Sequence, residues 1–336
     1  MIESPSHFNN RRRSHPRLIS IMYRSVALLL FLATPAIFFA AQQSADNSLR
    51  DRASSRSHPN SATTDGLSCS RFEWISADIS PKAAMLVPIS LNGVPYWYQF
   101  DTGADVLIPY GSVKKKGWSP AGGAVRIPNV RFAGMSFSSI LGYPMKDSSD
   151  PTHPKDQHGT VGLEILIGRA LVIDFPKQRI CLLERADLPM SLIRKADWTS
   201  AEVRHGKLFV DLDLNGKKLD GILYDTGSSP DVLDVDFGLW KEATGRSSTR
   251  DATTHSSGQS WGHELEFIGA PASGDLKIGN HVYHGPMMTT TPTQPDTFRT
   301  DYWGQGLLGN ALFTESVIIL DLGAHPRFGV IDNGSR

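Results

Sequence analysis

The chain has 336 residues, of which 40% are apolar, and it contains 30 Gly and 21 Pro. This length and composition are typical of a globular, turn-rich protein with room for two lobes. The formal net charge is zero, but residues 1–41 carry five Arg against one Glu, which leaves the remainder weakly acidic. A weakly acidic body without a basic stripe argues against nucleic acid as a partner.

The first 41 residues have the pattern of an export signal. A group of Arg residues precedes an apolar run from Val26 to Ala41, which is interrupted by Pro35. The run is shorter than the ~20 residues that a membrane-spanning helix prefers. We therefore expect residues 1–41 to be a signal peptide or an N-terminal anchor. The mature chain is expected to be periplasmic or secreted, touching a membrane only if this segment stays uncleaved.

Residues 42–70 are rich in Ser, Asn, Asp and Arg and contain few large apolar side chains. Such a composition cannot bury a core, so the segment is predicted to be a disordered linker, and a role as a pro-segment stays open. The two cysteines, Cys69 and Cys181, could form a disulfide in an oxidising compartment. Two unpaired cysteines are nearly as compatible with the sequence.

The tripeptide Asp-Thr-Gly occurs twice, at Asp101–Gly103 and at Asp225–Gly227. Each copy follows an apolar run with aromatic residues, at positions 96–100 and 221–224, which is typical of a β-strand. Each copy therefore predicts a carboxylate at the end of a buried strand. A pair of such carboxylates is the arrangement that can share one proton and one water.

The repeat extends well beyond these tripeptides. Each copy is preceded by Leu-Asn-Gly, whose Asn-Gly pair predicts a hairpin turn, and is followed by a Gly-x-apolar-Gly element with an Asp 15 residues after its first Gly. The matched segments are residues 91–93 and 214–216, residues 159–162 and 306–309, and Asp174 and Asp321. The sequence thus predicts a duplicated, all-β unit with little helix.

This duplication divides the chain into an N-terminal lobe at residues 71–184, a connector at residues 185–201 and a C-terminal lobe at residues 202–336. The repeated motifs resemble those of retropepsin-like and pepsin-like aspartic proteases, most closely the bacterial families with two retropepsin-like lobes fused in one chain. The resemblance covers roughly residues 85–184 and 205–332. It implies an all-β, bilobal acid-protease fold built from two tandem retropepsin-like β-barrel lobes with short helices.

The resemblance also implies a function. Asp101 and Asp225 would form a catalytic pair that activates a water for attack on a peptide carbonyl, with no metal and no cofactor. The chain would be a monomeric aspartic endopeptidase acting on a peptide or protein substrate. An acidic pH optimum is expected, because one carboxyl of the pair must stay protonated.

Neighbouring residues receive supporting roles from the same resemblance. The hydroxyls of Thr102 and Thr226 would bond to the backbone of the opposite loop. Gly103 and Gly227 would permit the tight turn and the close approach of the two loops. The later glycines, Gly162 and Gly309, would sit where a strand passes closely behind each loop.

Substrate contacts are expected from small residues and from a flap. Ala104 and Ser228 would leave room beside the water, and Ser228 could also donate to Asp225. The second half has 51 residues between its catalytic Asp and its later hairpin, enough for a flap on which Trp261 or His255 could touch substrate. The first half has only 29 such residues, so it is predicted to carry at most a stub.

Two functions stay compatible with these motifs. The first is the aspartic peptidase, and the alternative is a catalytically inactive, protease-like envelope protein that binds peptides or a protein partner. Carboxylates within hydrogen-bonding reach of each other would favour the enzyme. Since a shared fold does not guarantee a shared activity, the geometry of the site decides how strongly the first function is supported.

Overall fold

The computed structural model describes residues 37–38, 64–77, 80–111, 113, 115, 117–145, 157–260, 263–292, 298 and 303–332. The expected export signal therefore lies outside the described residues except for Ile37–Phe38 (β1), which pairs with β17. In the part of the chain that is described, no helix is both long and apolar enough to cross a membrane.

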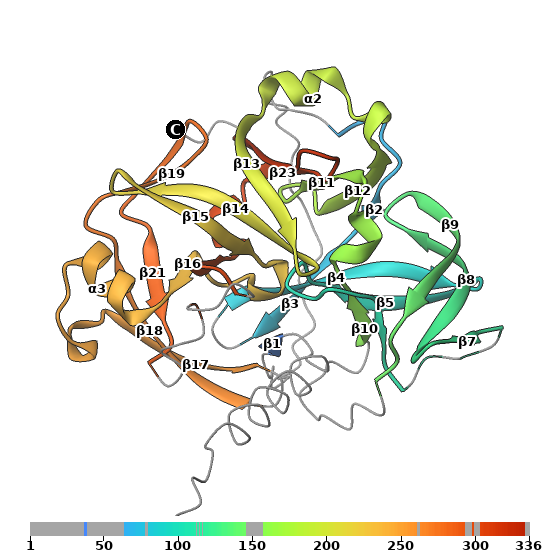
Figure 1. Cartoon of the computed structure of the whole chain (residues 1–336), viewed down its shortest axis with the longest axis horizontal. Helices are drawn as coiled ribbons and strands as arrows, with labels where there is room; N and C mark the ends of the chain where they lie inside the picture. The colour runs from blue at the N-terminus through green and yellow to red at the C-terminus, as the bar shows by residue number, and fades with distance from the viewer. Residues whose placement is uncertain are drawn as a thin grey trace, which may run out of the picture. The chain divides into compact units, whose positions relative to one another are not determined.

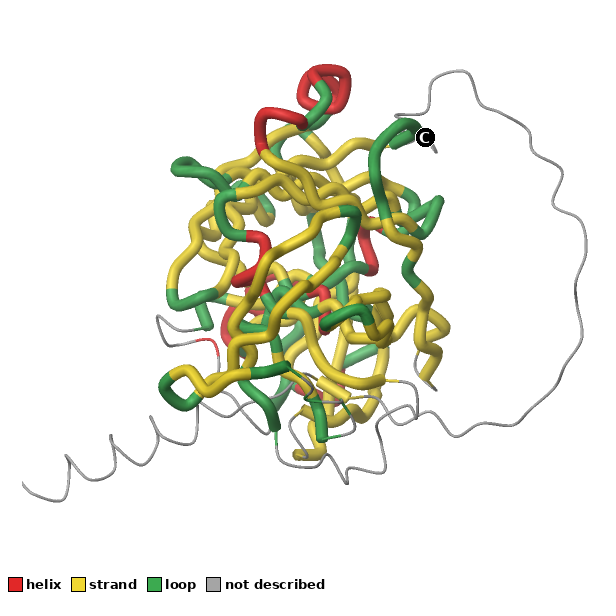
Figure 2. The backbone as a smooth tube through the Cα atoms, turned by 90° about the vertical axis from the view of Figure 1, so that its right-hand side faces the viewer, coloured by secondary structure: helices red, strands yellow, loops and turns green. Residues whose placement is uncertain are grey.

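Strands dominate the described residues, and the helices are short, as the red segments of Figure 2 show. The α-helices are Met190–Lys195 (α2) and Phe237–Thr244 (α3). Short 3-10 turns occur at Leu163–Leu166 (η1), Arg185–Asp187 (η2), Thr226–Ser228 (η3), Thr249–Asp251 (η4) and Ala311–Phe313 (η6). The all-β class expected from the sequence is confirmed.

The first half contributes an eight-stranded sheet, β3 to β10, and three further strands (Figure 1). Its strands are Ser70–Arg71 (β2), Glu73–Ala77 (β3), Ser80–Leu91 (β4), Val94–Phe100 (β5), Ile108–Pro109 (β6), Ser119–Ala121 (β7), Ala124–Phe132 (β8), Met135–Gly142 (β9), Gln157–Val161 (β10), Arg169–Asp174 (β11) and Arg179–Glu184 (β12). Strands β2, β11 and β12 leave this sheet and join strands of the second half.

The second half repeats the order of elements. Its strands are Asp197–Arg204 (β13), Lys207–Leu214 (β14), Lys217–Tyr224 (β15), Leu233–Val235 (β16), Thr254–Ser260 (β17), His263–Pro271 (β18), Asp275–Ile278 (β19), His281–His284 (β20), Met287–Thr290 (β21), Gly306–Leu308 (β22), Ser316–Asp321 (β23) and Arg327–Asp332 (β24). They belong to a sixteen-stranded network that also includes β1, β2, β11 and β12.

The two halves share one local topology around the Asp-Thr-Gly loops. In each, an antiparallel hairpin, β4–β5 or β14–β15, turns at an Asn-Gly pair with positive φ, at Asn92-Gly93 and Asn215-Gly216. The strand of the later Gly element, β10 or β22, then runs parallel to the second hairpin strand and antiparallel to β6 or β16. The duplication read from the sequence is therefore also a structural one.

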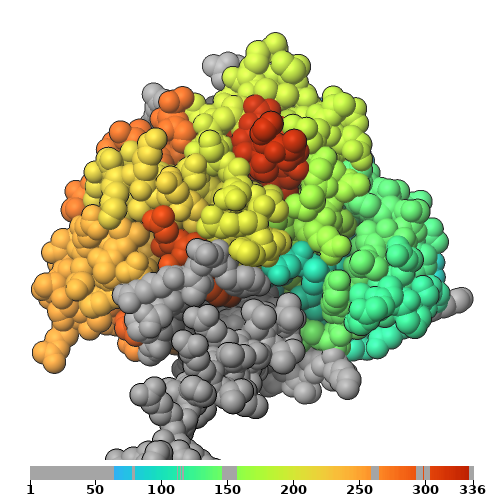
Figure 3. All heavy atoms as spheres, viewed as in Figure 1, coloured from blue at the N-terminus to red at the C-terminus, as the bar shows by residue number. Residues whose placement is uncertain are grey.

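A composite sheet joins the halves in the order β2-β12-β11-β23-β24-β13. Its central pair is β11 with β23, in which Leu171 lies opposite Leu320. Figure 3 shows the red segment that follows β23 lying beside green segments of the first half, in agreement with the hydrogen bond from Leu322 N to Arg169 O. The expected connector, residues 185–201, contains α2 and the start of β13, so part of it belongs to this sheet.

The predicted linker at residues 42–70 is wrong for its last residues. Residues 64–70 lie among the described part of the chain, and β2 pairs with β12. Cys69 and Cys181 form a disulfide, and Thr64 Oγ1 donates a hydrogen bond to Asp174 at 2.8 Å. Leu67 and Cys69 also pack, partly buried, against an apolar cluster. These few contacts anchor the segment although its overall composition is polar.

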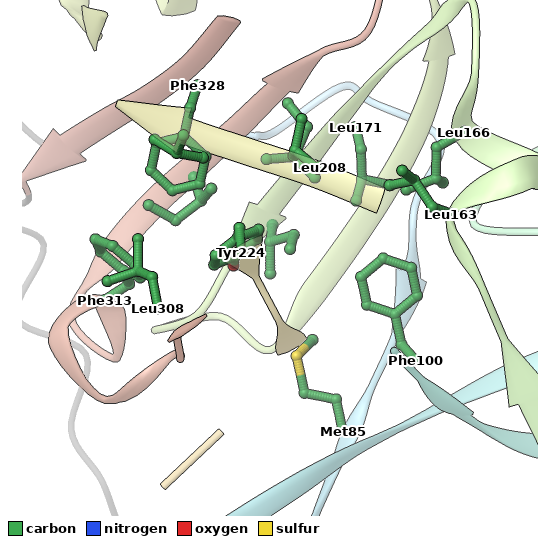
Figure 4. Close-up of a cluster of buried hydrophobic side chains, with 14 of the residues drawn as sticks. Met85, Phe100, Leu163, Leu166, Leu171, Leu208, Tyr224, Leu308, Phe313 and Phe328 are labelled. Carbon is green, nitrogen blue, oxygen red and sulfur yellow. The ribbon is translucent and has the colours of Figure 1, made fainter. Parts of the chain in front are cut away.

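Apolar packing fixes the strands that lead into the two loops. One buried cluster takes side chains from both halves, and Figure 4 shows part of it, including Phe100, Leu171, Leu208 and Tyr224. None of these four side chains is accessible to solvent. Since Phe100 and Tyr224 each precede a catalytic Asp candidate, packing of the core determines where both loops begin.

The hairpins beyond the loops differ in length between the halves. Strands β17 and β18 form a long hairpin in the second half, with Thr254 opposite Gly269 and Ser260 opposite His263. In the first half β7 has only three residues and pairs with the start of β8 around Gly122-Gly123. A long hairpin in one half and a stub in the other agree with the residue counts of the sequence.

Candidate active site

Each Asp-Thr-Gly loop is bonded to a neighbouring strand, which runs parallel to the strand that leads into the loop. The backbone N–H of Asp101 donates to Val161 O at 3.0 Å, and that of Asp225 donates to Leu308 O at 2.9 Å. The Gly elements recognised in the sequence therefore lie directly beside the loops. They extend each parallel pairing, β5 with β10 and β15 with β22, as far as the first residue of the loop.

The two carboxyl groups face each other across the loops. A Cβ added to Gly103 would lie 2.5 Å from Oδ2 of Asp225, and one added to Gly227 would lie 2.8 Å from Cγ of Asp101. Real Cβ contacts do not reach such distances, so only glycine leaves room for the opposite carboxyl group. A hydrogen bond joins the side chains of Asp101 and Asp225, which are 2% and 6% exposed.

Burial sets the electrostatics of this pair. Removal from water raises the pKa of Asp101 well above its usual value, and the charge and hydrogen bond of Asp225 raise it further. Lys207 and the N–H of Gly103 act in the opposite direction. Asp101 therefore retains its proton at a pH where an isolated Asp would have lost it.

A reciprocal set of hydrogen bonds locks the loops together. The N–H of Thr102 donates to Thr226 Oγ1, and the N–H of Thr226 donates to Thr102 Oγ1, both at 3.0 Å. The Thr102 hydroxyl then donates to Tyr224 O at 2.7 Å, and that of Thr226 to Phe100 O at 2.9 Å. Both threonines are fully buried. Each hydroxyl thus bonds to the backbone of the opposite half, as the resemblance implied.

The carboxylates are oriented by their own loops. Asp101 Oδ1 accepts from the N–H groups of Gly103 at 2.8 Å and Ala104 at 3.1 Å. Asp225 Oδ1 accepts from the N–H of Gly227 at 2.7 Å. One oxygen of each carboxyl group is therefore held by backbone donors.

The expected hydrogen bond from Ser228 to Asp225 is not formed. Ser228 Oγ instead donates to Asp231 Oδ2 at 2.6 Å. The turn that follows η3 is the reason, because its backbone bond from Asp231 N–H to Ser228 O at 3.1 Å brings this carboxyl group to the hydroxyl. Burial raises the pKa of Asp231 to about 6, and the Asp225 charge adds to this effect while Ser228 opposes it.

Close backbone packing explains the two later glycines. A Cβ on Gly162 would lie 2.5 Å from the N and O atoms of Val106, and one on Gly309 would collide with Ser228 O and Asp231 O. Each glycine thus lets a second segment pass directly behind an Asp-Thr-Gly loop. Their expected places are those found in the structure.

Two buried polar residues beside the loops were not recognised in the sequence. Asn310 donates to Ser229 Oγ and accepts from the Tyr224 hydroxyl, both at 2.8 Å. Lys207 donates to Asp105 Oδ1 at 2.9 Å and also to Gly103 O. The available signals were a lysine directly before the apolar run of residues 208–210 and an asparagine directly after a Gly element.

The expected substrate contacts on the flap are not assembled by the described residues. His255 is exposed on β17, opposite Ile268 and several residues back from the hairpin turn, and no contact joins it to either carboxyl group. Trp261 lies outside the described residues. Within the described ranges, no three His, Cys, Asp or Glu side chains are grouped in a way that could hold a metal ion.

Neither a protein-family model nor a curated protein matches this chain. The assignment of a function therefore depends on the site itself. The features available for it are the paired, buried carboxyl groups, the reciprocal threonine bonds and the duplicated strands that carry them.

Proposed function

We propose that the chain is an aspartic endopeptidase that hydrolyses peptide bonds with a water activated between Asp101 and Asp225. One observation carries the proposal. Two carboxyl groups from the two halves are buried together and hydrogen-bonded, and each lies against the glycine of the opposite loop. Two buried carboxyl groups in contact cannot easily both be ionised, so the pair is expected to share one proton. Such a perturbed pair is typical of a catalytic site.

The chemistry follows from the sharing of that proton. The ionised carboxyl group takes a proton from the bound water, which attacks the carbonyl carbon of the substrate. The protonated partner donates to the oxygen on which negative charge develops. Thr102 and Thr226 keep the two loops in register during these steps, because their bonds cross between the halves.

We also propose that each half of the chain is a retropepsin-like lobe. The matched hairpins, the matched parallel strand pairs and the glycines behind each loop support this description of the fold. The β17–β18 hairpin is the natural flap, since it is the long hairpin of the second half. The protein would be an exported monomer that cleaves peptide or protein substrates.

A library experiment tests the proposal. The purified chain is incubated with a diverse set of peptides from about pH 3 to pH 7, and products are identified by mass spectrometry. We expect internal cleavage with an acidic optimum, lost in both Asp101→Asn and Asp225→Asn. Asp187→Asn is the matched control, because this exposed carboxyl group lies in η2 and away from both loops.

The result also separates the two functions. Absence of cleavage by the wild-type chain across the whole range would refute the peptidase. Peptide binding that survives both active-site substitutions would then favour the inactive binding protein. Folding of each variant is checked by circular dichroism, so that loss of activity is not confused with loss of structure.

A further inference from the structure

A buried lysine of the second half bonds to the catalytic loop of the first. Lys207 begins β14, and its side chain is only 4% exposed. Its Nζ donates to Asp105 Oδ1 at 2.9 Å and to the carbonyl oxygen of Gly103, and it lies 4.9 Å from the centre of the Trp303 ring. An ammonium group is rarely buried unless it is paired in this way.

This cation lies very close to the carboxylate pair. The carbonyl of Gly103 accepts from Lys207, while the N–H of the same glycine donates to Asp101 Oδ1 at 2.8 Å. One residue thus connects the ammonium group to the carboxyl group. Burial and the Asp225 carboxylate raise the pKa of Asp101, and the positive charge of Lys207 lowers it.

The equivalent position of the first half carries no charge. Lys207 lies seven residues before Leu214 of the second Leu-Asn-Gly turn, and the same count back from the first turn reaches Ala84. Beside the second loop lies instead a second carboxyl group, that of Asp231, which interacts with Asp225. The two loops are alike in their hydrogen bonds but differ in their charged surroundings.

We propose that Lys207 is a positioning residue that fastens the first loop to the second half. Its positive charge keeps the carboxyl pair in the singly protonated, working state at a lower pH than the pair alone would allow. The proposal rests on the proposed peptidase function. A nearby cation favours each loss of a proton, so it moves both the acidic and the alkaline limb of a pH profile downward.

Other charged groups face this lysine or the pair and set the background for any pH measurement. The first loop contributes Asp101 and Asp105, and the second loop contributes Asp225 and Asp231. Close along the chain are Glu164 of η1, whose backbone N–H donates to Asp105 O, Arg204 at the end of β13 and His205 in the turn before β14. Asp105 partly offsets the charge of Lys207, because the two are paired. Removal of the Lys207 charge should therefore move the pH profile upward, and removal of the Asp105 charge should move it downward.

This opposition supplies the test. The pH dependence of kcat/KM is measured for the wild type, Lys207→Met, Lys207→Arg and Asp105→Asn. We expect both limbs to move upward by about one pH unit in Lys207→Met, since the nearby opposite charge is gone. Both limbs should move downward in Asp105→Asn. They should stay within about 0.3 units of the wild type in Lys207→Arg, which keeps the charge.

A second readout does not need activity. The side-chain carboxyl carbons of the Asp residues are labelled with ¹³C, and their chemical shifts are followed by NMR as the pH is changed. The Asp101 signal is assigned by its loss in Asp101→Asn. We expect this signal to titrate about one pH unit higher in Lys207→Met than in the wild type. If Lys207→Met does not fold, the opposite shift in Asp105→Asn carries the same comparison.

The outcomes are distinct. Unmoved limbs and an unmoved Asp101 signal in Lys207→Met would overturn the role of Lys207, and so would an equal upward shift in Lys207→Arg. Asp105→Asn shifting upward would also overturn it. A wild-type chain that cleaves nothing would refute the peptidase alone, and the NMR titration would still decide whether Lys207 tunes the pair.

Discussion

Replacement of Asp234 by Asn should remove much of the pH dependence of folding stability. Asp234 lies in β16, is 5% exposed, and has its Oδ2 3.5 Å from the Thr291 hydroxyl. Burial raises its pKa to about 8, and the charge of Asp231 adds to this effect. The hydrogen bond from Thr291 and the backbone N–H of Val235 act in the opposite direction.

The magnitude follows from the difference between folded and unfolded chains. In the unfolded chain this carboxyl group has its ordinary pKa of 3.8, so above that pH it loses a proton that the folded chain retains. The raised pKa therefore contributes its full stability to the folded state below the unfolded-state pKa of 3.8, and this contribution is lost as the pH rises from there through the folded-state pKa of about 8. Between about pH 4 and pH 7 the loss is about 4 kcal/mol.

Urea denaturation from about pH 4 to pH 8 measures this effect. The wild type should lose stability as the pH rises, and Asp234→Asn should flatten the dependence because the amide resembles the neutral acid and does not ionise. Asp187→Asn serves as the control, since its carboxyl group is exposed. A dependence in Asp234→Asn that runs parallel to the wild type would refute the reasoning, whatever the absolute stabilities.

The remaining predictions concern the loops and the cross-link. Thr102→Val and Thr226→Val should each lower the free energy of unfolding by roughly 2–4 kcal/mol, because each leaves two buried backbone groups unpaired; a cost under about 0.5 kcal/mol in either would contradict this. Gly227→Ala would place a Cβ 2.8 Å from the carboxyl group of Asp101, and kcat/KM should fall by about 100-fold or more in a chain that still folds. Cys181→Ser opens a disulfide between residues 112 apart and should lower the free energy of unfolding by roughly 2–5 kcal/mol; the reductant sensitivity of the wild type should then disappear, and its persistence would contradict the assignment.

Much of the fold could be predicted because its signals are local and occur twice. Asn92-Gly93 and Asn215-Gly216 specify hairpin turns by their own backbone preferences, and the turns have the positive φ values that this requires. Equal spacing from each Gly element to a later Asp indicated that the halves correspond. The unequal number of residues before each later hairpin likewise indicated one long hairpin and one stub.

Two expectations failed. One involves contacts between residues far apart in the sequence, and the other involves the geometry of a local turn. The polar composition of residues 64–70 predicts a linker, whereas the disulfide Cys69–Cys181 and the hydrogen bond to Asp174 hold this segment on the first half. Ser228 was assigned to Asp225 because the two lie close in sequence. The turn after η3, closed by the bond from Asp231 N–H to Ser228 O, directs the hydroxyl to Asp231 instead.

Local patterns predict that two carboxylates end two matched strands and that glycines follow them, because strand patterns and turn chemistry depend on neighbouring residues. That each carboxyl group lies against the opposite glycine, and that Lys207 reaches the first loop while Asp231 lies beside the second, depends instead on long-range packing. Lys207 and Gly103 are 104 residues apart in the chain. No periodicity connects positions so distant, so their contact depends on how the two halves pack against each other.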